Sequence, residues 1–310
     1  MNARKIERAL VTGASSMIGA ALVKALLEEG VRVTAVVRPG SGKLSNLPEN
    51  APGLQVIPCD ISELSTLPEG TQDAFFHFMW KGTIGSGRND VALQEENVHY
   101  TLDAVRKAKA CGCSVFIGAG SQAEYGPKNE ALTEETPLSP VTAYGKAKRK
   151  AEDLSRRLAG TIGLDHIFVR ILSVYGPGDN PQTMIMQAIN SLTHGETPSF
   201  TPAEQLWDYL YVEDAAVAFR KLAVYGKSGE AYVLGSGTAR PLKEYIYALR
   251  DAVDPALPVG IGVLPYAEGQ IMNLQADIGK LTKDTGFMPG IPFEEGIRMT
   301  VSWYREKLYE

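Results

Sequence analysis

Near its N-terminus the chain reads Ala9-Leu10-Val11-Thr12-Gly13-Ala14-Ser15-Ser16-Met17-Ile18-Gly19. The apolar residues 9–12 predict a strand, and residues 20–29 predict an amphipathic helix that Gly30 ends. Strand, glycine turn and helix in this order let a backbone approach a pyrophosphate, which then sits on the N–H groups of the helix N-terminus. Ser16 takes the middle glycine position of that pattern, so an ordinary turn is the alternative interpretation.

A second strand is expected at residues 31–37, and the residue after it indicates which dinucleotide the turn would bind. An Asp or Glu there would bond the adenosine ribose 2′-hydroxyl, whereas an Arg suits a 2′-phosphate. The chain has Arg38, with Ser41 and Lys43 close behind and no carboxylate. Arg38 therefore favours NADP(H) as the cofactor, with NAD(H) as the alternative. The pattern is also compatible with an Arg38 that is only a surface residue in a loop.

The remaining pattern alternates between strands and helices. Further strands are expected at residues 54–58, 74–78, 114–117 and 231–234, and helices at 97–110, 143–158, 184–192, 213–223, 241–253 and 293–307. This alternation predicts an α/β fold, a Rossmann-type doubly wound parallel sheet. We expect residues 1–174 plus about 208–235 to form that dinucleotide-binding domain. A smaller C-terminal substrate-binding lid domain would comprise about 175–207 and 236–310.

Tyr144 and Lys148 begin the predicted helix at residues 143–158. Residues four apart lie on one face of a helix, so the phenol and the ammonium can point into one cleft. A phenol has a pKa of about 10, and a nearby cation favours the phenolate and lowers that pKa toward the range useful for proton transfer. A half-buried Tyr beside a solvated Lys is the alternative interpretation.

Two further polar residues follow predicted strands, where parallel sheets hold ligands. Ser121 lies in the loop Gly118-Ala119-Gly120-Ser121-Gln122-Ala123-Glu124-Tyr125-Gly126 and is placed to bond a substrate oxygen beside Tyr144. It could equally satisfy only backbone groups of the turn. Asp60, with Ile61 beside it, follows the third strand. Its carboxylate could accept a hydrogen bond from an adenine amino group or cap the next turn.

Composition limits the partners. The net charge is −5 and no block of Lys and Arg occurs, which argues against nucleic acid or an anionic membrane as the main partner. No apolar run approaches the roughly 18 residues of a spanning helix, and the polar residues 1–8 show no signal peptide. Three cysteines and four scattered histidines indicate a reducing, cytoplasmic compartment and no metal site.

Taken together, these motifs resemble the extended short-chain dehydrogenase/reductases, in their NAD(P)-dependent epimerase/dehydratase branch, which mainly handles nucleotide-activated sugars. The resemblance covers most of the chain in the right order. It rests on the glycine turn at residues 12–19, on Ser121 four residues before Tyr125-Gly126, on Tyr144 with Lys148, and on residues 170–178 and 207–214.

The resemblance implies roles for individual residues. Tyr144 would be the general acid/base, Lys148 would bind the nicotinamide ribose and lower the phenol pKa, and Ser121 would polarise the sugar carbonyl or hydroxyl. The implied cofactor contacts are Gly13, Ser15, Ser16, Met17, Ile18, Arg38, Asp60, Ile61, Phe78, Asn97, Tyr144 and Lys148, and the implied substrate contacts are Ser121, Gln122, Ser173, Tyr175 and Arg240. Relatives pair the helices at 97–110 and 143–158 into a four-helix bundle, which implies a homodimer.

Several positions depart from the family pattern. Sugar 4,6-dehydratases carry an acidic pair directly after the Ser or Thr, where this chain has Gln122 and Ala123. Dehydration needs an acid and a base, and neither residue can titrate, so the sequence argues against a dehydratase. Ser173 replaces a frequent Asn, Trp207 replaces a frequent Arg, and residues 78–80 are bulkier than usual.

The expected function is an NADP(H)-dependent oxidoreductase that reduces a carbonyl of a nucleotide-linked keto-deoxysugar. An NAD-dependent nucleotide-sugar epimerase would use the same residues and return the hydride to the opposite face. A catalytically silent, NADP-sensing protein on the same fold is the remaining alternative.

Overall fold

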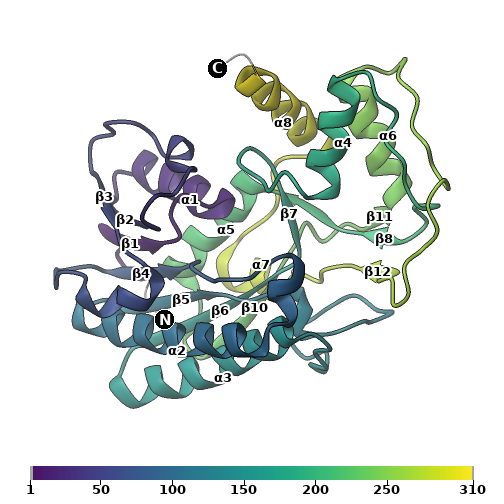
Figure 1. Ribbon diagram of the computed structural model, residues 1–310. Coiled ribbons are helices and arrows are strands. Elements are labelled where there is room, and N and C mark those ends of the chain that lie inside the picture. Colours follow the sequence, from purple (N-terminus) through teal and green to yellow (C-terminus); the bar gives the residue numbers. More distant parts are fainter. Residues whose placement is uncertain (1–2, 309–310) are drawn as a thin grey trace.

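The computed structural model describes residues 3–308, which are arranged around a seven-stranded parallel sheet (Figure 1). The strand order is β10-β6-β5-β4-β1-β2-β3. The strands are β1 Arg8–Thr12, β2 Arg32–Val37, β3 Leu54–Pro58, β4 Ala74–His77, β5 Val115–Ala119, β6 Asp165–Ile171 and β10 Glu230–Leu234. The predicted doubly wound α/β fold is therefore confirmed. The sheet contains β6 in addition to the six strands predicted from sequence.

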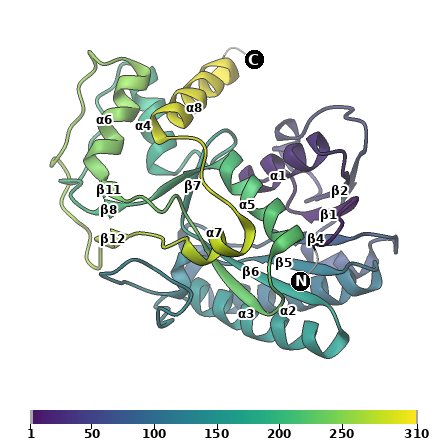
Figure 2. The ribbon, with the colours of Figure 1, turned by 180° about the vertical axis from the view of Figure 1, so that it is seen from behind.

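Two helix layers cover this sheet (Figures 1 and 2). One layer holds α1 Met17–Glu28 and α5 Val212–Tyr225, and the other holds α2 Val91–Ala110 and α3 Ala143–Ile162. Ala9 and Val11 of β1 belong to the hydrophobic cluster under α1 and α5, whereas Leu10 belongs to the cluster under α2. Both faces of the inner strands β1, β4 and β5 are buried, which explains why these strands read as continuous apolar runs.

Helix starts differ from the predicted ones because side-chain caps decide them. The hydroxyl of Ser16 accepts a hydrogen bond from the N–H of Gly19, so α1 begins three residues earlier than residue 20. Asp90 accepts from the N–H of Leu93, so α2 begins six residues before residue 97. Thr142 caps α3 at the predicted residue.

The rest of the chain forms smaller sheets and a second group of helices. One small sheet joins β11 Arg240–Pro241, β8 Leu206–Trp207 and β12 Asn273–Leu274, and another joins β7 Ser173–Tyr175 to β9 Tyr209–Tyr211. The helices are α4 Met184–Thr193, α6 Leu242–Val253, α7 Gly279–Thr285 and α8 Phe293–Leu308. Helices α4, α6 and α8 share their own hydrophobic cluster, separate from those of the main sheet. The predicted domain boundaries stay a prediction.

Four short 3₁₀ helices lie in the connections: η1 Leu44–Asn46, η2 Ile61–Thr66, η3 Gly85–Asn89 and η4 Gln122–Glu124. In residues 3–308 no helix is both long and apolar enough to cross a bilayer.

The strand order reverses beside β1, which pairs with β2 on one side and with β4 on the other. Open parallel sheets bind ligands at the carboxyl ends of the strands at such a reversal. Gly13 follows β1 at this point with φ 69°, and a Cβ on it would lie 3.0 Å from the backbone of Phe78 and Met79 after β4. A Cβ on Gly19 would collide with the carbonyl oxygen of Gly13. Only glycine fits at these two positions, so the turn keeps its backbone open to a ligand.

Candidate functional site

The N-terminus of α1 faces the crevice between β1 and β4, with Ser15 and Ser16 at its first turn. The hydroxyl of Ser15 lies 3.2 Å from that of Ser41, and its carbonyl accepts from Asn46 at 3.0 Å. Arg38 is exposed directly after β2, and its carbonyl accepts from the N–H of Ser41. Helix N–H groups and two hydroxyls therefore lie at one corner, with Arg38 in the same turn as Ser41, which suits an anionic ligand.

The other predicted cofactor residues have partners inside the protein. The carboxylate of Asp60 accepts from the N–H and hydroxyl of Ser62 and from Lys81 at 3.1 Å, and these bonds lower its pKa to about 2. It therefore caps η2, the second of the two roles considered from sequence. Ile61 is buried, and Phe78 packs edge-on against Phe219 at a centroid distance of 4.8 Å.

Asn97 is completely buried rather than open to the crevice. Its side-chain oxygen accepts from the N–H of Lys81, and its amide donates to the carbonyls of Lys81 and Leu93. The contact with a cofactor that the resemblance implies for Asn97 stays a prediction, and every polar atom of its side chain already has a partner in the protein. Asn97 holds the loop that follows β4.

The three predicted catalytic residues do lie together. Ser121 follows β5 and is within hydrogen-bonding reach of the Tyr144 hydroxyl at the start of α3. The Lys148 ammonium lies 5.8 Å from the centre of the Tyr144 ring and donates to the carbonyl of Ala119 at 2.7 Å. A phenol, a serine hydroxyl and a lysine amine thus meet at the carboxyl end of β5.

The charge state of this group differs from the sequence expectation. Burial raises the pKa of Tyr144 above its usual value, while the hydrogen bond to Ser121 and the charge of Arg88 oppose the rise. Burial also lowers the pKa of Lys148, which the charge of Glu124 opposes. The sequence predicts that Lys148 lowers the phenol pKa, whereas in the structure the burial of the ring raises it.

Sequence reasoning did not assign Trp80 or Arg88 to the catalytic group. The indole of Trp80 meets the Tyr144 ring edge-on at 6.0 Å, and the Lys148 ammonium lies 3.6 Å from the centre of an indole ring. The guanidinium carbon of Arg88 lies 4.4 Å from the centre of the Tyr144 ring. The bulk of Trp80 was visible in the sequence. No sequence pattern indicated the contact between Arg88 and Tyr144, because the two residues are 56 positions apart.

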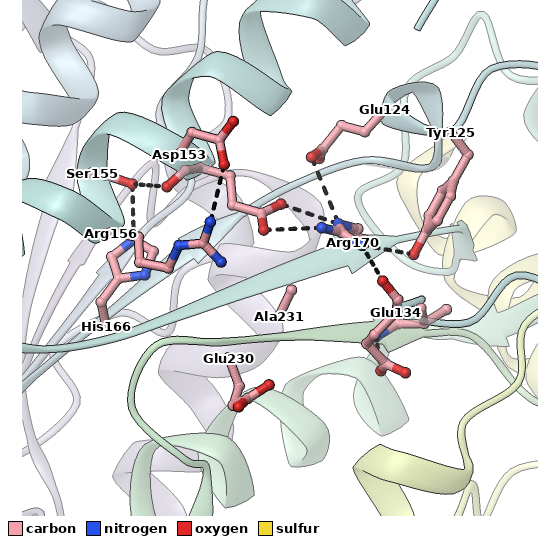
Figure 3. Close-up of polar contacts among 12 residues, drawn as sticks. Glu124, Tyr125, Glu134, Asp153, Ser155, Arg156, His166, Arg170, Glu230 and Ala231 are labelled. Carbon is pink, nitrogen blue, oxygen red and sulfur yellow. Dashed lines mark hydrogen bonds and ion pairs between the residues drawn. The ribbon is translucent and has the colours of Figure 1, made fainter. Parts of the chain in front are cut away.

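A buried polar network around Arg170, which includes Glu124 and Tyr125, lies next to the loop that carries Ser121 (Figure 3 shows the network). Glu124 accepts a hydrogen bond from the N–H of Ser121 at 2.7 Å. Arg170 of β6 donates two hydrogen bonds to Glu152 of α3, at 2.9 and 3.1 Å, and a third to the hydroxyl of Tyr125 at 3.2 Å. Figure 3 shows Arg170 between Glu124 and Tyr125. The loop that carries Ser121 is thus attached to both a strand and a helix.

Within this network Glu124 is fully buried, and its second oxygen lies 3.8 Å from Arg170 without a hydrogen bond in the described part of the chain. Burial raises the pKa of Glu124 to about 8, and the charge of Glu152 adds to the rise while Arg170 opposes it. The carboxyl group therefore tends to be neutral at pH 7 and faces the network rather than a ligand.

The predicted substrate residues lie apart from one another. Gln122 is half-buried in η4 beside Ser121, and the hydroxyl of Ser173 accepts from the Trp207 indole at 2.8 Å. Tyr175 is only 1% exposed and its hydroxyl donates to the carbonyl of Phe293, so its predicted contact with substrate stays a prediction that its burial does not favour. Tyr175 packs in the core shared by α4, α6 and α8.

Arg240 was expected to contact a diphosphate. Its guanidinium donates to Glu294 at 2.7 Å and lies 4.3 Å from the centre of the Tyr245 ring. A phosphate would therefore have to replace Glu294 at this arginine, at the cost of an existing charge-assisted hydrogen bond.

A pocket of about 510 Å³ opens between α4, β8 and residues 198–201. Aromatic and amide side chains dominate its wall, including Gln187, Phe200, Gln205, Trp207, Tyr209 and Gln270. None of the described residues that line it is charged. Its size falls in the range of ordinary small-molecule sites, and its aromatic rings suit a flat, neutral group. No group of three or more His, Cys, Asp or Glu that could hold a metal occurs in residues 3–308.

Residues 9–235 match the model of the NAD dependent epimerase/dehydratase family. The chain belongs to this family. It is therefore an enzyme of the extended short-chain dehydrogenase/reductase type, as the motifs indicated.

Two curated relatives are dTDP-glucose 4,6-dehydratases. The one from Salmonella typhimurium is 30% identical over 180 residues, which cover 56% of this chain and only 50% of that protein. The one from Neisseria gonorrhoeae is 26% identical over an alignment that covers 95% of this chain and 94% of that protein.

Two solved structures extend the comparison to the whole fold. A UDP-N-acetylglucosamine 4-epimerase from Methanobrevibacter ruminantium, in complex with UDP-N-acetylmuramic acid, has a TM-score of 0.89 at 25% identity and covers 98% of this chain and 99% of that one. A dTDP-glucose 4,6-dehydratase from Streptomyces venezuelae with NAD bound has a TM-score of 0.84 at 26% identity, covering 96% and 97%.

Proposed function

We propose that this member of the epimerase/dehydratase family is an NADP(H)-dependent oxidoreductase that reduces a carbonyl of a nucleotide-activated keto-deoxysugar. The observation that carries the proposal is the meeting of Ser121, Tyr144 and Lys148 at the carboxyl end of β5, on the same sheet edge as the glycine turn after β1. The relatives compared above act on or bind nucleotide sugars, which supports the substrate class.

The bound nicotinamide would supply the hydride to the carbonyl carbon. Tyr144 would give its proton to the carbonyl oxygen, and Ser121 would donate a hydrogen bond to the negative charge that develops there. The raised pKa of Tyr144 keeps the phenol protonated at neutral pH, which suits a proton donor better than a base.

The corner formed by Ser15, Arg38 and Ser41 supports a 2′-phosphate on the cofactor, because a cation and two hydroxyls meet there without a carboxylate. The uncharged aromatic pocket beside α4 would take the base of the nucleotide. These residues suit the 2′-phosphate of the cofactor and the base of the sugar nucleotide. The diphosphate of the sugar nucleotide would have to compete with Glu294 for Arg240.

Dehydration is not proposed, even though the curated relatives above are dehydratases. Gln122 and Ala123 follow Ser121 and cannot exchange protons in that reaction. Glu124, the nearest carboxyl group in sequence, bonds the backbone of Ser121 and belongs to the network around Arg170.

Epimerisation is the second candidate, and the structural match to a 4-epimerase over nearly the whole chain favours it. It would use the same three residues and a retained NAD. The two candidates differ in whether the reduced cofactor is consumed.

The test is to mix the enzyme and NADPH with 4-keto-6-deoxy sugars linked to dTDP, UDP, CDP or GDP and to follow absorbance at 340 nm. A reductase consumes NADPH and absorbance falls, with NADH turned over more slowly. Product formation with no net absorbance change would instead indicate an epimerase. Cofactor binding without conversion of any of these sugars would leave the NADP-sensing alternative.

The matched variant for the cofactor part of this assay is Arg38→Asp. It replaces the proposed phosphate contact by a carboxylate, so kcat/KM for NADPH is expected to fall by roughly 10- to 100-fold while NADH is affected less. An equal loss with both cofactors would remove Arg38 from phosphate recognition.

A further inference from the structure

The segment between β4 and α2, residues 80–90, is held over the catalytic group by one buried amide. The side chain of Gln94 is 1% exposed. Its oxygen accepts from the indole of Trp80 at 2.8 Å, and its NH₂ donates to the carbonyls of Gly82 at 2.9 Å and Gly87 at 2.8 Å. One residue of α2 therefore ties both ends of this segment to the helix.

Close backbone packing gives the segment little freedom to rearrange. A Cβ on Gly87 would lie 2.8 Å from the Cα of Gly82, and a Cβ on Gly82 would lie 2.7 Å from the side chain of Leu93. Arg88 comes directly after Gly87, and its guanidinium donates to the carbonyl of Thr83 at 3.0 Å. The position of the Arg88 side chain therefore follows from the fold of the segment.

This arrangement places the Arg88 guanidinium on the face of the Tyr144 ring, with its carbon 4.4 Å from the ring centre. Such contacts between a cation and an aromatic ring are attractive, and Arg remains charged over the whole working pH range. The other charged or titratable groups around Tyr144 are Lys148 of α3 and Glu124 of η4. Burial favours the neutral form of each, so Arg88 is the dependable positive charge beside the phenol.

We propose that Arg88 is a positioning residue of this active site, which holds a permanent positive charge against Tyr144 and thereby favours the phenolate. The proposal rests on the proposed acid/base role of Tyr144. The Arg88 charge opposes the effect of burial on the pKa of Tyr144, and Lys148 is not among the groups that lower it. Arg88 thus takes over part of the electrostatic role that the sequence pattern had given to Lys148.

The test is an NMR titration of the protein labelled with ¹³Cζ-tyrosine between pH 7 and 11.5, with the Tyr144 signal assigned from Tyr144→Phe. In Arg88→Gln the ionisation of Tyr144 is expected to move up by about one pH unit or more, as for loss of a neighbouring charge. Arg88→Lys keeps a charge and is expected to restore most of the shift.

The matched control is Arg106→Gln on the exposed surface of α2, where Arg106 pairs with Asp103. It is expected to leave the Tyr144 titration unchanged, and circular dichroism at each pH checks that every variant stays folded. An Arg88→Gln titration equal to the wild-type one would overturn the proposal. So would a wild-type Tyr144 that stays protonated up to pH 11.5.

This titration needs neither cofactor nor sugar, so it gives its answer even if no sugar nucleotide is turned over. Should the titration shift as expected while the 340 nm assay finds no substrate, the role of Arg88 stands and the proposed substrate is wrong. If the 340 nm assay finds a substrate but the titration does not shift in Arg88→Gln, the enzyme assignment stands and Arg88 does not have the proposed role.

Discussion

Replacing Tyr144 with Phe is expected to lower kcat by roughly two to four orders of magnitude while the Kd for NADPH stays unchanged. Only the hydroxyl is lost, because the Phe ring keeps the edge contact with Trp80 and the face contact with Arg88. Turnover is measured at 340 nm, and NADPH affinity is measured by fluorescence. The variant removes the proposed proton donor, whereas the glycine turn that we propose to bind the cofactor is unchanged.

The matched control is Tyr100→Phe, which removes the same hydroxyl from a residue on α2. The Tyr100 hydroxyl bonds Glu96 on the exposed side of the helix, so activity is expected to remain within a factor of two or so. Turnover by Tyr144→Phe equal to that of the wild type would remove Tyr144 from the mechanism, and with it the proposed reduction.

Replacing Glu152 with Met is expected to reduce the free energy of unfolding by about 3–5 kcal/mol, because it leaves the buried Arg170 without its bidentate partner. Glu152 is 3% exposed and Arg170 5% exposed. The hydroxyl of Tyr125 and a backbone carbonyl remain as acceptors, but neither carries a charge. Urea denaturation followed by circular dichroism measures the loss.

Two further variants separate the buried pair from an ordinary ion pair. The double variant Glu152→Met with Arg170→Met removes both charges and is expected to be more stable than the single variant. Glu95→Met breaks the exposed pair with Lys150, 2.6 Å long, and is expected to cost about 1 kcal/mol or less. Equal losses from Glu152→Met and Glu95→Met would show that the network around Arg170 does not hold the Ser121 loop in place.

Local patterns accounted for most of the main sheet and for the glycine turn. Apolar runs predicted β1 to β5 and β10, because both faces of a parallel sheet are buried and each strand must be apolar throughout. Apolar runs predicted the first residues of helices less well. The starts of α1 and α2 depend on the side chains of Ser16 and Asp90, which accept hydrogen bonds from backbone N–H groups of the first helical turn. The strand β6 was overlooked, although it lies between β5 and β10 in the sheet.

Part of the predicted catalytic group also followed from local sequence spacing. Tyr144 and Lys148 are one helical turn apart, so their common face follows from the helix alone. The contact of Ser121 with Tyr144 followed from the rule that loops at strand ends converge at a sheet edge. The same reasoning did not predict that Tyr175 and Asn97 are buried, because it counts motif positions and not the burial of each side chain.

The sequence by itself predicted the parallel sheet, the glycine turn and the pairing of a phenol with an amine, since apolar runs, glycine positions and a spacing of four residues are all visible as local patterns. Tertiary structure alone decided that burial would raise the pKa of Tyr144 and that Arg88 would lie on its ring. It also decided that Glu124 would be enclosed with Arg170 and Glu152. These features depend on how much water the packed chain excludes and on which distant side chains it brings within a few ångströms.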